Sequence, residues 1–192
     1  EDNLHAALVL MREKRIHQLP VTEGKKLIGI ITDRDIRQAS SPRLQDKKLE
    51  MDPLLSSIRV EEIMAREVIT VSPQAPLEDA ILLLYLNRFG GLPVVEGDGE
   101  LVGIITKTDI LKSFIETLGI GEPSSRLELV LEDSPGALAE VVKIIQKYNI
   151  NISSIMSAPH EEKNKKNIFL RLATIDLTNV KEALLKAGYT II

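Results

Sequence analysis

Residues 29–36 read Gly-Ile-Ile-Thr-Asp-Arg-Asp-Ile, and residues 103–110 repeat the phrase as Gly-Ile-Ile-Thr-Lys-Thr-Asp-Ile. In both copies an apolar run reaches a threonine, and an aspartate follows three residues later at the start of an expected helix. Upstream, Leu19-Pro20-Val21 returns as Leu92-Pro93-Val94. The sequence therefore predicts two copies of one structural unit, in each of which a strand leads into a helix.

Each copy is expected to fold as helix, strand, strand and helix. Apolar residues at intervals of three and four predict a first helix over residues 1–19 and its counterpart over residues 77–92. Two strands follow, joined by a turn at residues 23–26 in the first copy and by Gly97-Asp98-Gly99 in the second. The copies should pack about a pseudo-two-fold axis, which would create two related clefts.

The second copy has a lead-in that the first copy lacks. Residues 60–64 indicate a short helix, and residues 67–71 indicate a strand that Pro73 ends. Either the first copy lacks an opening strand that was removed or unobserved, or the first repeat is naturally shorter; we expect the former. The predicted boundaries are 1–40 for the first repeat, 38–57 for a polar connection, 58–118 for the second repeat, 119–125 for a linker and 126–192 for a C-terminal domain.

Composition limits the functions open to this chain. Its 192 residues are 44% apolar, which suits one or two domains with a buried core. The absence of cysteine excludes a thiol nucleophile and a zinc-thiolate site, and no apolar run approaches the ~20 residues that span a bilayer. A net charge of −4 and few aromatic residues argue against nucleic-acid binding. We expect a cytoplasmic protein that binds neither membrane nor nucleic acid.

No catalytic or metal-binding motif stands out. The sequence contains no Gly-x-Ser-x-Gly, Walker-type or dinucleotide-binding motif, so we do not expect an enzyme. His5 and His17 have no third ligand of a metal site nearby in the sequence, so we expect no metal site.

The repeated motifs resemble those of the CBS domain. The Gly-Ile-Ile-Thr-x-x-Asp phrase, the Leu-Pro-Val strand and the lead-in occur in that family's order, although Ala65 stands where the family often has threonine. CBS domains occur in tandem and sense adenosine-containing ligands. The resemblance implies an α+β pair that binds an adenine nucleotide of the AMP, ATP or S-adenosylmethionine type as a regulatory ligand, with no required cofactor.

Two interpretations of the Thr-x-x-Asp phrase stay open. Thr32 and Asp35, like Thr106 and Asp109, can form a capping pair that satisfies backbone amides without any ligand. Alternatively, as the resemblance implies, the aspartate binds the cis-diol of a ribose while the threonine and the first-turn amides face a phosphate. Both roles can coexist.

Further residues complete the site that the resemblance implies. Arg34 and Lys107, the cations within the two phrases, would either neutralise phosphate charge or remain solvated. Residues of the Leu-Pro-Val strands and of the lead-in would hold the adenine, but they suit a core equally well. These candidates are Leu19, Pro20, Val21, Val68, Ile69, Thr70, Leu92, Pro93 and Val94.

After the linker, the pattern predicts the order β-α-β-β-α-β of the ferredoxin-like fold. Asp133-Ser134-Pro135-Gly136 predicts capping side chains and a proline at the first helical position. This stretch and Asn149-Ile150-Asn151-Ile152 resemble the ACT domain, a module that usually pairs and binds amino acids or similar effectors. The implied ligand residues are Asp133, Gly136, Ala137 and Asn149; the alternative is that they only shape the helix start of an assembly surface.

A CBS pair followed directly by an ACT domain resembles the acetoin utilization protein AcuB family, whose proposed role is regulatory. We therefore expect a homodimeric nucleotide sensor that controls acetoin catabolism through a target enzyme. Two alternatives remain open: a regulatory segment of a longer enzyme or transporter, and a structural adaptor without a ligand.

Overall fold

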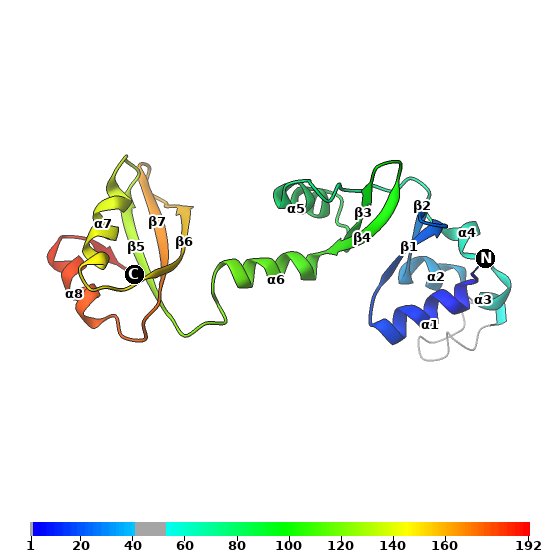
Figure 1. Cartoon of the computed structure of the whole chain (residues 1–192), viewed down its shortest axis with the longest axis horizontal. Helices are drawn as coiled ribbons and strands as arrows, with labels where there is room; N and C mark the ends of the chain where they lie inside the picture. The colour runs from blue at the N-terminus through cyan, green and yellow to red at the C-terminus, as the bar shows by residue number, and fades with distance from the viewer. Residues whose placement is uncertain (1, 41–52) are drawn as a thin grey trace. The chain divides into compact units, whose positions relative to one another are not determined.

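The computed structural model describes residues 2–40 and 53–192. The chain divides into two compact units, residues 1–110 and residues 111–192 (Figure 1). The described residues form eight helices and two four-stranded antiparallel sheets, one sheet in each unit. None of these helices is long and apolar enough to cross a membrane. The predicted α+β architecture is confirmed.

The first unit contains the two predicted repeats up to the first turn of the last helix, which continues into the second unit, and each repeat has the expected order of helix, strand, strand and helix. The first repeat consists of α1 (Leu4–Lys14), β1 (Gln18–Glu23), β2 (Lys26–Thr32) and α2 (Asp33–Ala39). The second repeat consists of α5 (Leu77–Leu86), β3 (Gly91–Glu96), β4 (Glu100–Thr106) and α6 (Lys107–Thr117). Between them lie α3 (Pro53–Ser57) and α4 (Val60–Ile63).

Three predicted boundaries were wrong. Helix α1 ends at Lys14 and α5 at Leu86, because Arg15 and Arg88 take left-handed backbone conformations with φ of 54° and 57° that stop the helical path. The predicted lead-in strand over residues 67–71 is reduced to one parallel bridge between Val71 and Val94. Most of the predicted polar connection lies outside the described residues, and its end forms α3.

The two repeats are related by a pseudo-two-fold axis at the ends of their hairpins. Strand β2 meets β4 at Lys26 and Glu100, which occupy the same position in the two repeats, and this contact gives the sheet order β1-β2-β4-β3. The Leu27 N–H donates to the Gly99 carbonyl at 3.0 Å, and the Leu101 N–H donates to the Lys25 carbonyl at 2.9 Å. Such reciprocal bonds between equivalent residues are the mark of a two-fold contact.

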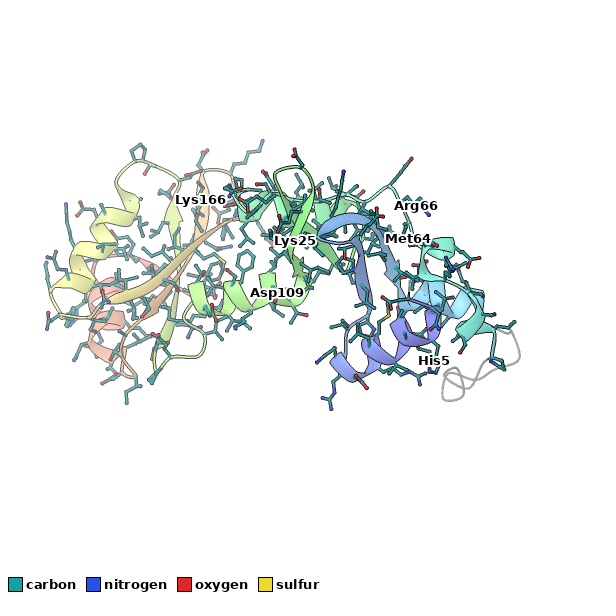
Figure 2. The ribbon with its side chains drawn as sticks, turned by 45° about the vertical axis from the view of Figure 1, so that its right-hand side comes forward. His5, Lys25, Met64, Arg66, Asp109 and Lys166 are labelled. Carbon is teal, nitrogen blue, oxygen red and sulfur yellow. The ribbon has the colours of Figure 1, made fainter. Side chains whose placement is uncertain are left out.

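The lead-in connects the cores of the two repeats. Val60 and Met64 are buried in the core of the first repeat, whereas Val71 belongs to the core of the second. Ala65 exchanges two backbone hydrogen bonds with Ile30, both of 2.9 Å. Figure 2 labels Met64 where the lead-in passes the sheet of the first repeat.

The second unit confirms the predicted ferredoxin-like order. Its elements are β5 (Ser125–Glu132), α7 (Ala137–Gln146), β6 (Ile152–Pro159), β7 (Lys165–Leu172), α8 (Thr178–Lys186) and β8 (Thr190–Ile191). Leucines that alternate along β5 pack with apolar residues of α7 and α8 in one core. The predicted proline start of α7 was wrong, because Gly136 is the N-cap, with φ of 91°, and the helix begins at Ala137 without a side-chain cap.

Gly29 and Gly103 occupy the same position in the two repeats, but only Gly29 is covered by the lead-in. A Cβ atom on Gly29 would overlap with the Met64 side chain, whereas a Cβ on Gly103 would meet nothing within 4 Å. We predict that Gly29→Ala lowers the free energy of unfolding by about 1–3 kcal/mol through overpacking. The matched variant Gly103→Ala should change it by less than ~0.5 kcal/mol. Urea denaturation checks both variants, and equal losses would contradict the asymmetry.

Candidate functional site

Both Thr-x-x-Asp phrases form the capping pair that the sequence predicts. In the first repeat, the Thr32 hydroxyl donates to Asp35 Oδ2 at 2.6 Å, and the Thr32 N–H donates to the same oxygen at 2.8 Å. The Asp35 N–H in turn donates to the threonine hydroxyl oxygen at 3.3 Å. Thr106 and Asp109 repeat these three bonds at 2.6, 2.8 and 3.2 Å. The capping interpretation is confirmed, and the ribose role stays a prediction.

This capping geometry constrains how a ligand would use the aspartate. In the first repeat, both bonds from Thr32 end on the same carboxylate oxygen of Asp35, and the threonine hydroxyl donates and accepts within the pair. A diol that bonds to Asp35 must therefore use Oδ1 or displace the threonine. Displacement would remove the helix cap, so only the first route leaves α2 intact.

The Leu-Pro-Val strand of the first repeat lines the largest pocket described here. Leu19, Pro20 and Val21 form one wall of a cavity of about 620 Å³. Ala7 and Leu10 of α1 form another part of its apolar lining. Pockets of this size suit small molecules and cofactors. The predicted adenine wall of the first repeat is thus accessible from this cavity, and its role in binding adenine stays a prediction.

Two guanidinium groups at this pocket were missed by the sequence reasoning. Arg59 and Arg66 flank the lead-in helix, and both line the cavity together with the carboxylates of Asp2, Glu23 and Glu61. Arg59 donates to the Glu61 side chain at 3.3 Å, and Arg66 donates to the Glu61 carbonyl at 3.1 Å. The two arginines on either side of residues 60–65 were the available signal, but only the fold brings them to a cavity that β1 also lines.

The other predicted residues lie elsewhere. Thr32, Arg34 and Asp35 are at the start of α2 and are not among the residues that line the 620 Å³ cavity. In the second repeat, Leu92 is only 1% exposed and belongs to the core, and Pro93 is buried beside it. The remaining candidates of that repeat are partly buried or exposed: Val68, Ile69, Thr70 and Val94.

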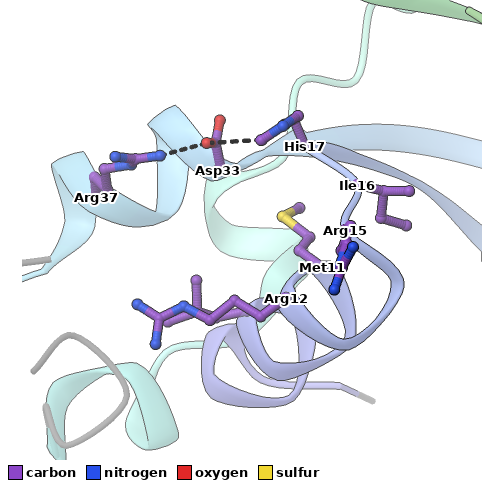
Figure 3. Close-up of a pocket in the computed structure, with 8 residues that line it drawn as sticks. Met11, Arg12, Arg15, Ile16, His17, Asp33 and Arg37 are labelled. Atoms are coloured by element: carbon purple, nitrogen blue, oxygen red, sulfur yellow. Dashed lines mark hydrogen bonds and ion pairs between the residues drawn. The ribbon is translucent and has the colours of Figure 1, made fainter. Parts of the chain in front are cut away.

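A second pocket lies where α1 ends and α2 begins (Figure 3). Its volume is about 340 Å³, and its rim carries Arg12, Arg15 and Arg37. Arg37 donates to Asp33 Oδ2, and His17 Nδ1 lies 3.3 Å from the same oxygen. Burial raises the pKa of Asp33, but the hydrogen bonds and charges of Arg37 and then His17 outweigh it, so the pKa falls below its ordinary value. Sequence reasoning did not identify this cluster.

The second repeat has a pocket at the corresponding place. Lys107 and Arg88 line a cavity of about 560 Å³ beside Tyr85. Lys107 corresponds to Asp33, and Arg88 corresponds to Arg15 in the aligned repeats. Lys107, predicted as a phosphate-neutralising cation, therefore faces a pocket, whereas its capping neighbours Thr106 and Asp109 do not line it.

The predicted ACT ligand residues surround the start of α7 and the turn after it. Asp133 forms an ion pair with Lys166 at 3.0 Å, and its N–H donates to the Asn164 carbonyl at 2.6 Å. Gly136 and Asn149 both have a positive φ, of 91° and 54°. The ion pair gives Asp133 a partner within the domain, and a ligand role for this group stays a prediction.

Comparison with known proteins assigns both units to families. The CBS domain model matches residues 1–42 and 60–116, and the ACT domain model matches residues 125–188. A CBS domain-containing protein of Dictyostelium discoideum is 35% identical over 127 residues, which cover 65% of this chain and 88% of that protein. The inosine-5′-monophosphate dehydrogenase of Korarchaeum cryptofilum is 32% identical over 135 residues, 70% of this chain, but this match spans only 25% of the dehydrogenase.

Two solved structures are similar to about three-fifths of this chain. CBSX2 from Arabidopsis thaliana is similar with a TM-score of 0.52 and 28% identity, over 60% of this chain and 82% of that chain. A protein assigned to acetoin utilization (AcuB) from Vibrio cholerae has a TM-score of 0.51 and 32% identity, over 63% of this chain and 85% of that chain.

The capping pairs predict a stability effect that needs no ligand. Asp35→Ala removes the acceptor of two hydrogen bonds from Thr32, so we expect the free energy of unfolding to fall by about 1–2 kcal/mol. Arg34→Ala, one position earlier in α2, is the matched control and should change it by less than ~0.5 kcal/mol. Urea denaturation without nucleotide measures both, and an unchanged Asp35→Ala variant would contradict the capping role.

Proposed function

This chain belongs to the CBS-domain family and carries an ACT domain after its CBS pair, and from this premise we propose that it is a non-catalytic sensor of an adenine nucleotide. The observation that carries the proposal is the 620 Å³ pocket along β1. It joins the apolar Leu-Pro-Val wall, which the family resemblance assigns to adenine, to the guanidinium groups of Arg59 and Arg66. An apolar wall beside two cations suits a base with a phosphate attached.

One side of this pocket is apolar, and the other side carries the two arginines. The adenine ring would lie against Leu19 and Pro20, and the phosphate would accept charge-assisted hydrogen bonds from the arginines. Glu61 competes for both arginines, because it accepts from Arg59 through its side chain and from Arg66 through its carbonyl. A phosphate must therefore replace part of this bonding, and the positive charge of the two guanidinium groups is what would distinguish a phosphorylated ligand from neutral adenosine.

Ligand binding at this place can act on both repeats. The two arginines belong to the lead-in, whose residues are buried in the core of the first repeat at Met64 and of the second at Val71. A nucleotide that holds the lead-in against β1 would favour one relation between the repeats. Coupling of this kind requires that the ligand prefers that arrangement over its alternatives.

We extend the proposal to the biological role that the AcuB resemblance implies. In this role the chain forms a homodimer, responds to a nucleotide and acts on a target enzyme of acetoin catabolism. The ACT domain would add a small effector such as an amino acid near Asp133 and Gly136. The ribose role of Asp35 and Asp109 makes the Thr-x-x-Asp turns the alternative position of the nucleotide.

A second candidate function is that of a regulatory segment within a longer enzyme or transporter. The match to the Korarchaeum cryptofilum dehydrogenase favours it, because the aligned segment is a quarter of a much larger enzyme. The two candidates share the nucleotide pocket and differ in what it controls.

Calorimetry with AMP, ATP, S-adenosylmethionine and adenosine tests the proposed function. We predict that Arg66→Ala weakens AMP binding about tenfold or more, the loss of one charge-assisted hydrogen bond. Binding of adenosine should change little in this variant. Arg34→Ala is the control, because Arg34 does not line the pocket.

The results with these variants distinguish the pocket along β1 from the Thr-x-x-Asp turn as the nucleotide site. Loss of AMP binding in Asp35→Ala but not in Arg66→Ala would move the site to the Thr-x-x-Asp turn. If none of the four compounds binds, the proposed sensor function is contradicted. A structural adaptor without a ligand is then the remaining function.

A further inference from the structure

The polar groups of the pocket where α1 ends and α2 begins are bonded to one another. Asp33 Oδ2 accepts a hydrogen bond from Arg37 of the same helix and lies 3.3 Å from Nδ1 of His17, the residue before β1 (Figure 3). These three residues all line the cavity of about 340 Å³. The carboxylate is thus engaged by partners within the chain, and the first repeat supplies its own counter-charge here.

The second repeat keeps none of these three groups. When the repeats are aligned on their Thr-x-x-Asp and Leu-Pro-Val stretches, Lys107 takes the place of the aspartate, Leu111 that of the arginine and Gly90 that of the histidine. A cation therefore replaces the anion, and uncharged residues replace both of its partners. The corresponding cavity of the second repeat is also larger, at about 560 Å³.

The lining of this larger cavity combines two cations with apolar groups. Lys107 is the first residue of α6, and Arg88 lies two residues after the end of α5. The other lining residues are apolar or aromatic: Ile81, Leu84, Tyr85, Leu86 and Ile110. No carboxylate occurs among the described residues that line it. The described lining therefore carries two positive charges and no negative one.

Both cations are without a partner in the part of the chain that the structure describes. Neither the Lys107 ammonium nor the Arg88 guanidinium forms an ion pair or a side-chain hydrogen bond there. Lys112, further along α6, differs from them because it pairs with Glu116 at 3.9 Å. Two cations beside an apolar wall suit a ligand that has an anionic group and an apolar body.

We propose that this cavity binds an organic acid with an apolar body, such as an aryl or branched-chain carboxylate, as a second ligand of the chain. The anionic group would accept charge-assisted hydrogen bonds from Arg88 and Lys107. The apolar body would lie against the half-buried Ile81 and Ile110. The Tyr85 ring, which is 76% exposed, would pack on the outer face of a flat body. The cavity volume is within the range of small-molecule sites.

The lining favours such an acid over the adenine nucleotide of the proposed function. Asp109, to which the family resemblance assigns the ribose, does not line this cavity, and its Oδ2 is bonded to Thr106. Apart from the two cations, the Tyr85 hydroxyl is the one polar side-chain group of the described lining. Ribose hydroxyls would therefore lose water without gaining enough partners, which an acid without a sugar avoids.

Titration of the whole chain with 2-naphthoate, followed by NMR of the backbone amides, tests the proposal. We expect saturable shifts of the Arg88 and Lys107 amide resonances. Acetate keeps the anionic group without the body, and 2-naphthalenemethanol keeps the body without the charge. Each of these two compounds should bind at least about tenfold more weakly than naphthoate, because each loses one of the two kinds of contact.

Two variants each remove one cation and suit the local backbone. Arg88→Asn is compatible with the φ of 57° at this position, because asparagine tolerates the left-handed conformation. Lys107→Asp gives α6 the residue type that begins α2. Each variant should weaken naphthoate binding about tenfold or more. The matched control is Lys112→Gln, on the same helix but outside the cavity, and it should leave the affinity unchanged. Unchanged amide resonances in β1 and β2 show that a variant is folded.

Four results would overturn the proposal. Naphthoate fails to bind, its affinity is unchanged in either cation variant, the neutral alcohol binds as tightly, or AMP displaces naphthoate from this cavity.

The same titrations keep this proposal apart from the proposed function, because the cavity shares no residue with the pocket along β1. Arg66→Ala should leave naphthoate binding unchanged, and Arg88→Asn should leave AMP binding unchanged. Loss of naphthoate binding in Arg66→Ala instead would place the acid in the pocket along β1 and contradict the second site. Failure of AMP to bind would contradict the nucleotide sensor and leave the naphthoate result standing.

Discussion

The reciprocal hydrogen bonds between Leu27 and Gly99 and between Leu101 and Lys25 join the two repeats into one sheet. The ion pair of Lys25 with Glu100, at 2.8 Å, lies at the same contact but is largely exposed, so it adds little to stability. The contact is short, and strand β2 meets β4 only where the hairpins end. This contact pairs equivalent residues of β2 and β4, so it relates the two repeats by a pseudo-two-fold axis. Each surface of one repeat therefore has an equivalent surface on the other.

That relation makes the lead-in the structural element that distinguishes the repeats. It crosses from the core of the first repeat at Met64 to the core of the second at Val71. Its arginines border the pocket along β1, and its methionine covers a glycine that has an uncovered counterpart in β4. One segment therefore accounts for the proposed nucleotide site and for the difference in cover between the two repeats. The aspartates of the repeated phrase, by contrast, serve the helix starts in both copies.

Local patterns predicted the parts of this structure that depend on local chemistry. The repeated Gly-Ile-Ile-Thr phrases gave both hairpins and both capping pairs, since strand periodicity and the spacing of threonine and aspartate act within a few residues. The helix ends were placed too late, because Arg15 and Arg88 adopt a conformation that usually calls for glycine. Pro135 suggested a helix start that Gly136 provides instead. Arg59 and Arg66 meet β1 only through tertiary contacts, and so does His17 with Asp33, whereas the pairing of Asp33 with Arg37 is local to α2 and was overlooked.

The central claim is that the two repeats are paired about their hairpin ends. Native-state hydrogen exchange of the Leu27 and Leu101 amides tests it most directly, since each donates one of the two reciprocal bonds. The account predicts that both amides are protected and to a similar degree. Exchange of either amide at the rate of an unstructured peptide, while the buried strand residue Ile31 stays protected, would contradict it.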